Sequence, residues 1–336
     1  MSECFCVTVG HSASVPVRIA EGTISSKTSG WAYAAVFTLA WAAYLVYSRA
    51  GTKAGLHPLD FALLRYGGAA TLLAPAFFSR GNVSNLGGMG WGRGLALTLC
   101  AGPIFIAAST SGFLFAPLAH GALAQPCSAT IGTLLLATVF LGERLTRTRI
   151  AGIFVLLAGI FVVVLGGRPL AHGSDAPTWP GDLLFISAGC LWAGYSVLLR
   201  RWRIDPLHGA AVISMLSALA VLPMYLAAGD FSRLLGLGTG VLIAQLIVHG
   251  VLAGALAVIA FGRAVVILGA AGAAPFQAIV PGLAIFLGIP VVGEIPTMLQ
   301  ALGLVIAGVG LLAAIGIVRF PLRAAPHPDL CERDIR

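Results

Sequence analysis

The stretch Trp-Ala-Ala-Tyr-Leu-Val-Tyr-Ser-Arg at residues 41–49 decides the fold, because it returns as Trp-Ala-Gly-Tyr-Ser-Val-Leu-Leu-Arg at residues 192–200. The two copies are 151 residues apart. The same offset relates Gly142-Glu143 to Gly293-Glu294. A constant offset means that no net insertion separates these matches, so the chain consists of two repeats of equal length.

The composition places both repeats in a membrane. Hydrophobic residues make up 58% of the chain, charged residues only 10%, and the mean hydropathy is +0.96. Soluble domains carry roughly 25% charged residues. The net charge of +8 does not indicate nucleic acid as a partner, because the basic residues lie between apolar segments rather than among aromatic side chains. The expected surroundings are therefore a lipid bilayer.

Ten apolar segments are each about 18–23 residues long, which is enough to cross a hydrocarbon core as a helix. We predict an all-α integral membrane protein with ten transmembrane helices in two inverted five-helix repeats. The expected organisation is a cytoplasmic polar extension, a first repeat, a linker, a second repeat and a cytoplasmic tail, at 1–29, 30–166, 167–181, 182–318 and 319–336. The predicted spans are 31–48, 58–78, 94–115, 119–141, 148–166, 182–199, 208–228, 240–262, 270–292 and 299–318.

The basic residues predict the orientation. With a cytoplasmic N-terminus, 15 Lys and Arg residues fall in inside segments, 4 fall in outside loops, and Arg65 lies within a helix. Cytoplasmic loops of membrane proteins carry such an excess of positive charge, so both termini are predicted to be cytoplasmic. Five helices per repeat is an odd number, so the second repeat enters the membrane upside down. The segment 143–149 carries three arginines and its counterpart 294–300 carries none, which agrees with this inversion.

The chain resembles an EamA-type member of the drug/metabolite transporter superfamily. The resemblance rests on Gly142-Glu143, on Gly293-Glu294, on Trp41 and Trp192 in the first helix of each repeat, and on Arg65 early in the second helix. It implies five-plus-five inverted helices and a secondary transporter that moves a small organic metabolite, amino acid or drug-like solute by alternating access. Such a function needs no ATP.

The chain departs from the family pattern in its prolines. The family usually has a proline about 13 residues before the glutamate, and Pro281 fits this position in the second repeat. The first repeat has Thr130 there, with Pro126 one turn earlier. Any kink in the fourth helix should therefore lie at a different depth from that in the ninth.

Arg65 is the sharpest candidate for a substrate-binding residue. It lies seven residues beyond Pro58, about 10 Å below the outer end of its helix. An intramembrane arginine must face the bundle or a wet cavity, where it can receive a carboxylate or phosphate group. The alternative is that it snorkels outward or binds helix carbonyls. Asp60 lies about 140° away around the helix and is a poor partner.

Other polar residues at membrane depth are expected to face the interior between helices 1–4 and 6–9, because polar groups in lipid need partners or water. Each histidine can bind substrate or titrate, or can simply be a hydrogen-bonded packing residue. One of the glutamines lies between Pro275 and Pro281 and can instead hold a kinked helix together. These candidates are His120, His249, Gln125, Gln245 and Gln277.

Aromatic residues occupy equivalent positions in the two repeats. Trp41 and Tyr44 correspond to Trp192 and Tyr195, and each pair lies three residues apart on one helical face. They can form an aromatic lining or gate at the repeat interface, or they can be ordinary helix packing. Their mid-span positions exclude an interfacial aromatic belt for the tryptophans.

Glu143 and Glu294 lie at predicted helix ends, where the helix dipole disfavours a negative charge. We expect each to accept hydrogen bonds from a neighbouring loop and, with Pro126 and Pro281, to have a structural role. Helices 5 and 10 carry glycines at a spacing of seven residues, which marks one face for close packing. We expect these helices to be peripheral or to contact another subunit, as in a homodimer.

Two other classes of protein stay open at this point, a membrane-embedded enzyme and a non-transporting scaffold. No His-Glu-x-x-His, Gly-x-Gly-Asp or Cys-x-x-Cys motif occurs, so we predict no enzyme activity, cofactor or metal site. No carboxylate lies deep in a predicted span, so a facilitator or exchanger fits at least as well as a proton-coupled carrier. Eighteen arginines against two lysines are typical of a high-GC bacterial genome and point to the inner membrane.

Overall fold

The computed structural model describes residues 20–81, 83–142, 145–166 and 177–317, without the side chains of 20–26, 141 and 269–275. Within these ranges every regular element is helical. Eight helical segments are long and apolar enough to cross a membrane, and two shorter apolar helices, Phe276–Val292 and Met298–Ala314, accompany them. This all-helical arrangement agrees with the predicted class and is compatible with ten spans.

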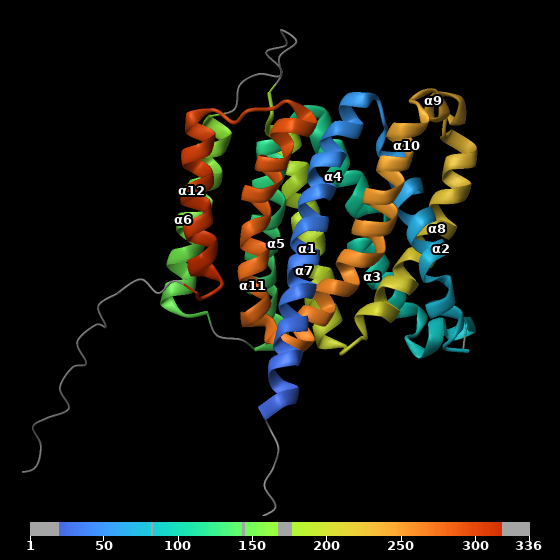
Figure 1. Ribbon diagram of the computed structural model, residues 1–336, viewed down its shortest axis with the longest axis horizontal. Coiled ribbons are helices and arrows are strands. Elements are labelled where there is room, and N and C mark those ends of the chain that lie inside the picture. The colour runs from blue at the N-terminus through green and yellow to red at the C-terminus, as the bar shows by residue number, and fades with distance from the viewer. Residues whose placement is uncertain (1–19, 82, 143–144, 167–176, 318–336) are drawn as a thin grey trace, which may run out of the picture.

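The helices of the first repeat are interleaved with those of the second across the bundle (Figure 1). Its first helix begins at Ala20, so residues 20–29, which we expected in the polar extension, belong to the helix. Adding turns to an existing helix costs little, since nucleation is the unfavourable step. The elements are α1 (Ala20–Ala54), α2 (Pro58–Phe78), η1 (Val83–Gly88), α3 (Trp91–Ala101), α4 (Pro103–Phe115), α5 (Leu118–Leu141) and α6 (Arg147–Leu165).

The second repeat follows the same order. Its elements are α7 (Trp179–Arg201), α8 (Pro206–Ala228), α9 (Phe231–Gly236), α10 (Thr239–Gln245), η2 (Leu246–Leu256), α11 (Ala257–Val292) and α12 (Met298–Ala314). Helical hydrogen bonding is assigned from Ala257 to Val292, but the chain reverses direction within this element. Phe261 packs on Phe37 of α1, and the Phe276 carbonyl accepts from the next residue of α1, Thr38. A straight helix would hold Phe261 and Phe276 about 22 Å apart, so the element comprises two antiparallel crossings, in agreement with the separate apolar segments Thr239–Leu268 and Phe276–Val292.

The bundle has two chemically different ends. At the end that we call the closed end, uppermost in Figure 1, α1 finishes near the start of α5, and Glu294 accepts a hydrogen bond from the Leu118 N–H. At the end that we call the basic end, Arg80 lies 3.9 Å from Asp205, and Arg201 donates to the Phe140 carbonyl. Of the arginines in the predicted cytoplasmic segments, four that the structure describes gather here: Arg149, Arg200, Arg203 and Arg263.

The third crossing is interrupted in both repeats. In the first repeat α3 and α4 meet at Gly102, and Pro103 begins α4. In the second repeat the equivalent stretch, Leu246–Leu256, has π-helical hydrogen bonding. The predicted spans at 94–115 and 240–262 are each found as a single crossing, Trp91–Phe115 and Thr239–Leu268, and each contains a break in the regular α-helical hydrogen bonding. Discontinuous helices in corresponding positions of two repeats commonly flank the substrate site of a transporter.

The Gly-Glu motif is a helix end. Gly142 and Gly293 close α5 and α11 with φ of 69° and 73°, a left-handed conformation that glycine adopts without strain. Four residues after each glycine, Thr146 and Thr297 cap the next helix by accepting from a backbone N–H. The repeated motif therefore encodes a tight turn between two antiparallel helices. Glu143 lies outside the described residues.

Helices α6 and α12 pair at one edge of the bundle (Figure 1). A methyl group on Gly152 would meet the Ala314 backbone, and one on Gly159 would meet Ala307. Gly303 and Gly310 are equally tight against α6. The two glycine faces therefore pack against each other within one chain. Our argument for a homodimer through these helices was wrong in this respect, because the faces that motivated it are already covered.

Candidate functional site

A cavity of about 650 Å³ lies between the two repeats. Helices α1 and α5 line it from the first repeat, and α7 and α11 line it from the second. Exposed arginines at the basic end, Arg200, Arg203 and Arg263, form its rim. Apart from Arg149 and Ile315 at their ends, α6 and α12 do not contribute to the lining described here. The cavity is therefore open towards the basic end.

Two tryptophans meet at the inner end of the cavity. The ring centroids of Trp41 and Trp192 are 4.5 Å apart, and each ring also packs on Phe105. Tyr44 lies against Trp41 and Tyr195 against Trp192, at 5.3 and 4.9 Å. Aromatic pairs at such distances are stabilising beyond their buried area. The symmetry-related residues thus form one aromatic cluster at the repeat interface.

A chain of hydrogen bonds leads from the cavity into the first repeat. Gln125 lines the cavity, and its Oε1 accepts from the Ser109 hydroxyl at 2.7 Å. Ser109 accepts in turn from the Tyr44 hydroxyl at 2.6 Å. The Gln125 Nε2 is buried and has no acceptor among the residues that the structure describes. The cavity therefore has one polar path through its otherwise aromatic inner end.

Arg65 lies behind this aromatic cluster and is only 2% exposed. Its guanidinium carbon is 5.3 Å from the ring centroid of Tyr44, 5.9 Å from that of Tyr66 and 6.0 Å from that of Phe105. Its Nε and Nη1 have no hydrogen-bond acceptor in the described part of the chain. The side chain therefore points into the bundle, and the snorkelling alternative does not hold.

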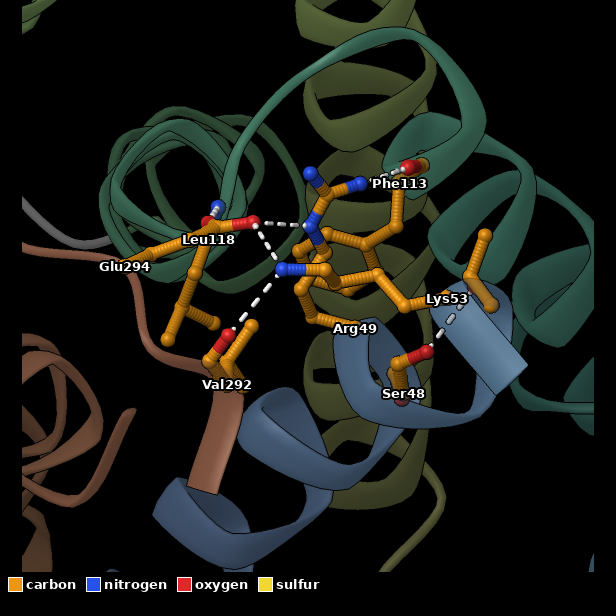
Figure 2. A network of polar contacts seen from close by, with 8 residues as sticks. Ser48, Arg49, Lys53, Phe113, Leu118, Val292 and Glu294 are labelled. Carbon is orange, nitrogen blue, oxygen red and sulfur yellow. Dashed lines mark hydrogen bonds and ion pairs between the residues drawn. The ribbon is translucent and has the colours of Figure 1, made fainter. Parts of the chain in front are cut away.

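Ion pairs seal the closed end, as Figure 2 shows. The Arg49 Nε donates to Glu294 at 2.7 Å, and the same guanidinium donates to the Phe113 carbonyl. Lys53 donates to the Val292 carbonyl at 3.0 Å and lies 3.7 Å from Glu294. Arg49 is 6% exposed, so its pairing with Glu294 is largely withdrawn from solvent. This network joins α1 of the first repeat to the end of α11 in the second.

A second network joins α2 to α8 and α9 at the same end. Asp60 accepts from the Tyr225 hydroxyl and from Arg233, both at 2.7 Å, and from the His57 N–H. The hydrogen bond to Asp60 raises the pKa of Arg233 above its ordinary value, so this arginine stays charged. Asp60 thus binds groups across the repeat interface, and Arg65 is not among its partners in the described part of the chain.

A third contact across the closed end is buried. The His120 Nδ1 lies 2.8 Å from the Asp182 carboxylate, in the first turns of α5 and α7. His120 therefore does not line the cavity, contrary to our expectation, because it is near the outer end of its helix. Asp182 lies in the first turn of its helix, at the edge of a span rather than deep within it.

The remaining candidates divide by position. Gln277 lines the cavity, as do Trp41, Trp192, Tyr195 and Gln125. His249 and Gln245 do not line it. His249 is fully buried against the rings of Tyr44 and Phe61, and Gln245 donates to the Tyr47 carbonyl. Pro126 lines the cavity, whereas Pro281 faces a smaller hollow between α5, α11 and α12.

Neither Arg49 nor Ser109 was predicted to be a site residue. Arg49 carried a signal, because it belongs to the repeated stretch and corresponds to Arg200, while its partner Glu294 belongs to the other repeated motif. Ser109 carried none, since small hydroxyl residues are common in membrane helices and usually bond to their own backbone.

Comparisons with known proteins agree with this geometry. The model of the EamA-like transporter family matches residues 28–165 and again residues 179–316. The chain belongs to the EamA-like transporter family. An uncharacterized protein of Pseudomonas aeruginosa is 30% identical over 282 residues, covering 82% of this chain and 91% of that protein. The uncharacterized transporter YyaM of Bacillus subtilis is 25% identical over 201 residues, covering 56% of this chain and 62% of that protein.

The fold has a counterpart among solved structures. One crystal structure of a protein superposes with a TM-score of 0.55 at 21% identity and covers 87% of this chain and 96% of its own. At this identity the likeness concerns the fold alone. The two matches of the family model fall on the two repeats read from the 151-residue offset.

Proposed function

We propose that this EamA-like family member is a secondary transporter, which moves a small organic solute across the membrane by alternating access between its two inverted repeats. The solute is a metabolite, amino acid or drug-like molecule that enters the cavity between the repeats. We further propose that the protein spans the bacterial inner membrane with both termini in the cytoplasm. The basic end then faces the cytoplasm, and the structure corresponds to a cytoplasm-open state.

The observation that carries this proposal is the unequal closure of the repeat interface. The cavity opens at the basic end, while three polar networks cross the interface at the closed end, through Glu294, Asp60 and Asp182. A site that is open on one side and sealed by polar contacts on the other is what alternating access requires. Opening these contacts while closing the arginine-lined rim would present the same site to the other side.

Reconstituted flux tests the proposal. The purified protein would first be screened by thermal shift against amino acids, nucleobases, sugars and organic cations, and stabilising solutes would then be followed as radiolabelled uptake into proteoliposomes. We expect saturable uptake of at least one solute in the absence of ATP. An enzyme would consume the solute instead of moving it, and a scaffold would leave it outside. Vesicles that accumulate none of these solutes above protein-free vesicles would overturn the proposal.

A matched pair of substitutions ties flux to the cavity. Thr133 lines the cavity on α5, and Val139 on the same helix is 76% exposed and outside the lining. Thr133→Trp should fill part of the 650 Å³ and reduce uptake at least tenfold, whereas Val139→Trp should leave it within about twofold of the wild type. Equal uptake by both variants would show that the solute takes another route.

A further inference from the structure

Arg65 is a buried positive charge that the described protein does not neutralise. The side chain lies in the membrane part of α2, and two of its nitrogens have no acceptor. An arginine at the centre of a bilayer costs at least ~2.5 kcal/mol on the insertion scale. Three aromatic rings within about 6 Å stabilise the charge through cation–π contacts. Rings do not replace the strong acceptors that a guanidinium fork binds best.

The acids whose side chains the structure describes are engaged elsewhere. Asp60 binds Tyr225 and Arg233. Glu294 pairs with Arg49, and Asp182 pairs with His120. At the basic end Asp205 lies beside Arg80 and caps α8, and at the opposite end Asp230 caps α9. The counter-charge for Arg65 must therefore come from outside the described protein.

One further donor lines the cavity on the side of the hydrogen-bond chain that ends at Tyr44, next to Arg65. The Gln125 amide has an Nε2 without an acceptor, and its Oε1 is held by the Ser109–Tyr44 chain, which fixes the amide in place. Tyr44 is also the ring closest to the guanidinium. A negatively charged group that passes the inner end of the cavity thus meets an amide donor first and the guanidinium next. Its apolar part would remain against Trp41 and Trp192.

The backbone around Arg65 is packed too closely to offer another route. A methyl group on Gly254 would lie 3.2 Å from the Arg65 carbonyl, and one on Gly250 would lie 2.9 Å from the Leu64 carbonyl. These glycines belong to η2, the interrupted crossing of the second repeat. Helix α2 therefore lies directly against this irregular segment, and the aromatic cluster is what separates the arginine from the cavity.

We propose that Arg65 is an anion-binding subsite, which receives a carboxylate or another small anion at the inner end of the central cavity. The inference rests on the proposed transport function and specifies its substrate class, because an organic carboxylate is the anion that the neighbouring aromatic cluster fits. The same chemistry admits a second source, an inorganic anion such as chloride that serves as a resident counter-ion. A guanidinium binds either one, and a carboxylate in two-pronged fashion.

Direct binding to the purified full-length protein tests this subsite without relying on transport. Thermal unfolding and tryptophan fluorescence would be titrated at low ionic strength with three probes: sodium chloride, sodium phenylacetate and the neutral analogue phenylacetamide. Trp41 and Trp192 lie next to the subsite and should report occupancy. We expect at least one of the two anions to stabilise the protein, and phenylacetamide to bind at least tenfold more weakly than phenylacetate wherever phenylacetate binds.

Three variants test whether the response to anions depends on Arg65. Arg65→Gln should weaken anion binding about tenfold or more, the loss expected for charge-assisted hydrogen bonds. Arg65→Lys should retain part of it, because an ammonium keeps the charge but loses the fork. Arg147→Gln, which removes an exposed arginine at the basic end, should respond like the wild type. A response to chloride alone identifies the inorganic counter-ion, and a response to phenylacetate identifies the carboxylate subsite.

Equal responses of the wild type and Arg65→Gln to both anions, including no response in either, would overturn the subsite. The flux assay separates this failure from that of the transport proposal. Solute uptake combined with equal anion responses would leave transport standing without an anion subsite. Anion binding that depends on Arg65, combined with no uptake of any solute, would leave the subsite standing without transport.

Discussion

Glu294→Gln should open the closed end more often. The carboxylate accepts from the Arg49 Nε at 2.7 Å and from the Leu118 N–H at 2.8 Å. An amide of the same size still accepts a hydrogen bond but carries no charge, and charge-assisted bonds are roughly twice as strong as neutral ones. Arg49 is 6% exposed, so it gains little from water when its partner loses the charge. The closed state should lose about 1–2 kcal/mol.

This loss translates into a population. A change of 1–2 kcal/mol shifts an equilibrium constant about five- to thirtyfold. This ion-pair network stabilises the state that is closed at this end and not the open one. The fraction of molecules open at this end should therefore rise five- to thirtyfold, until it approaches one half. The Lys53 ammonium is about half exposed and lies 3.7 Å from Glu294, so Lys53→Gln should change the population less than twofold. It is the matched control, because it removes a charge from the same network.

Cysteine accessibility measures the population. Ala116 is fully buried at the closed end and lies where α4 ends, three residues beyond the carbonyl that Arg49 binds. In a background without the six native cysteines, Ala116→Cys would be labelled with a membrane-impermeant maleimide applied from outside the cell. The labelling rate should rise about five- to thirtyfold with Glu294→Gln. A rate equal to that of the background, while Glu294→Gln folds normally, would refute a gating role for this ion pair.

Three further outcomes are expected. Gly159→Val should lower the free energy of unfolding by about 1–3 kcal/mol through its clash with Ala307, whereas Gly308→Val, with open space around it, should stay within about 0.5 kcal/mol in a thermal melt. Trp192→Ala should weaken binding of the transported solute about tenfold or more in fluorescence titrations, and an unchanged affinity would reduce the ring to helix packing. In intact cells, a cysteine at position 168 should be labelled from outside and one at position 147 protected; the reverse pattern would contradict the cytoplasmic assignment of the basic end.

The repeat made the centre of the molecule predictable. Residues related by a pseudo-twofold axis contact each other when they lie close to that axis. Trp41 and Trp192 are equivalent by the 151-residue offset, and their rings lie 4.5 Å apart. Hydropathy likewise predicted the helical segments, because an apolar run of sufficient length has few alternatives to a helix in lipid. The seven-residue glycine spacing correctly marked a packing face.

Long-range partners could not be predicted from the sequence in the same way. The glycine spacing of α6 does not say whether its face meets another subunit or α12, since both satisfy close packing equally well. The pairing of His120 with Asp182 depends on two helix starts meeting at one end of the bundle. Periodicity carries no information about such meetings between distant segments.

The hydropathy pattern of the sequence also did not predict where the helix backbone is irregular. The π-helical stretch around His249 has the same apolar composition as an ordinary span, because hydropathy measures side chains and is blind to the hydrogen-bond register. Gly102-Pro103 was the one legible sign of an interruption, since proline favours the first position of a new helix. Applying the 151-residue offset to that break would have pointed to the π-helical segment.

Locking the closed end tests alternating access most directly. Lys53→Cys and Ile295→Cys place two exposed thiols on either side of the Arg49–Glu294 pair and leave that pair intact. A reducible bis-maleimide would join them in proteoliposomes that transport an identified solute. Cross-linking should stop uptake, reduction should restore it, and each single-cysteine variant should be unaffected by the reagent. Undiminished uptake by fully cross-linked protein would contradict the account, because the solute would then cross without the closed end ever opening.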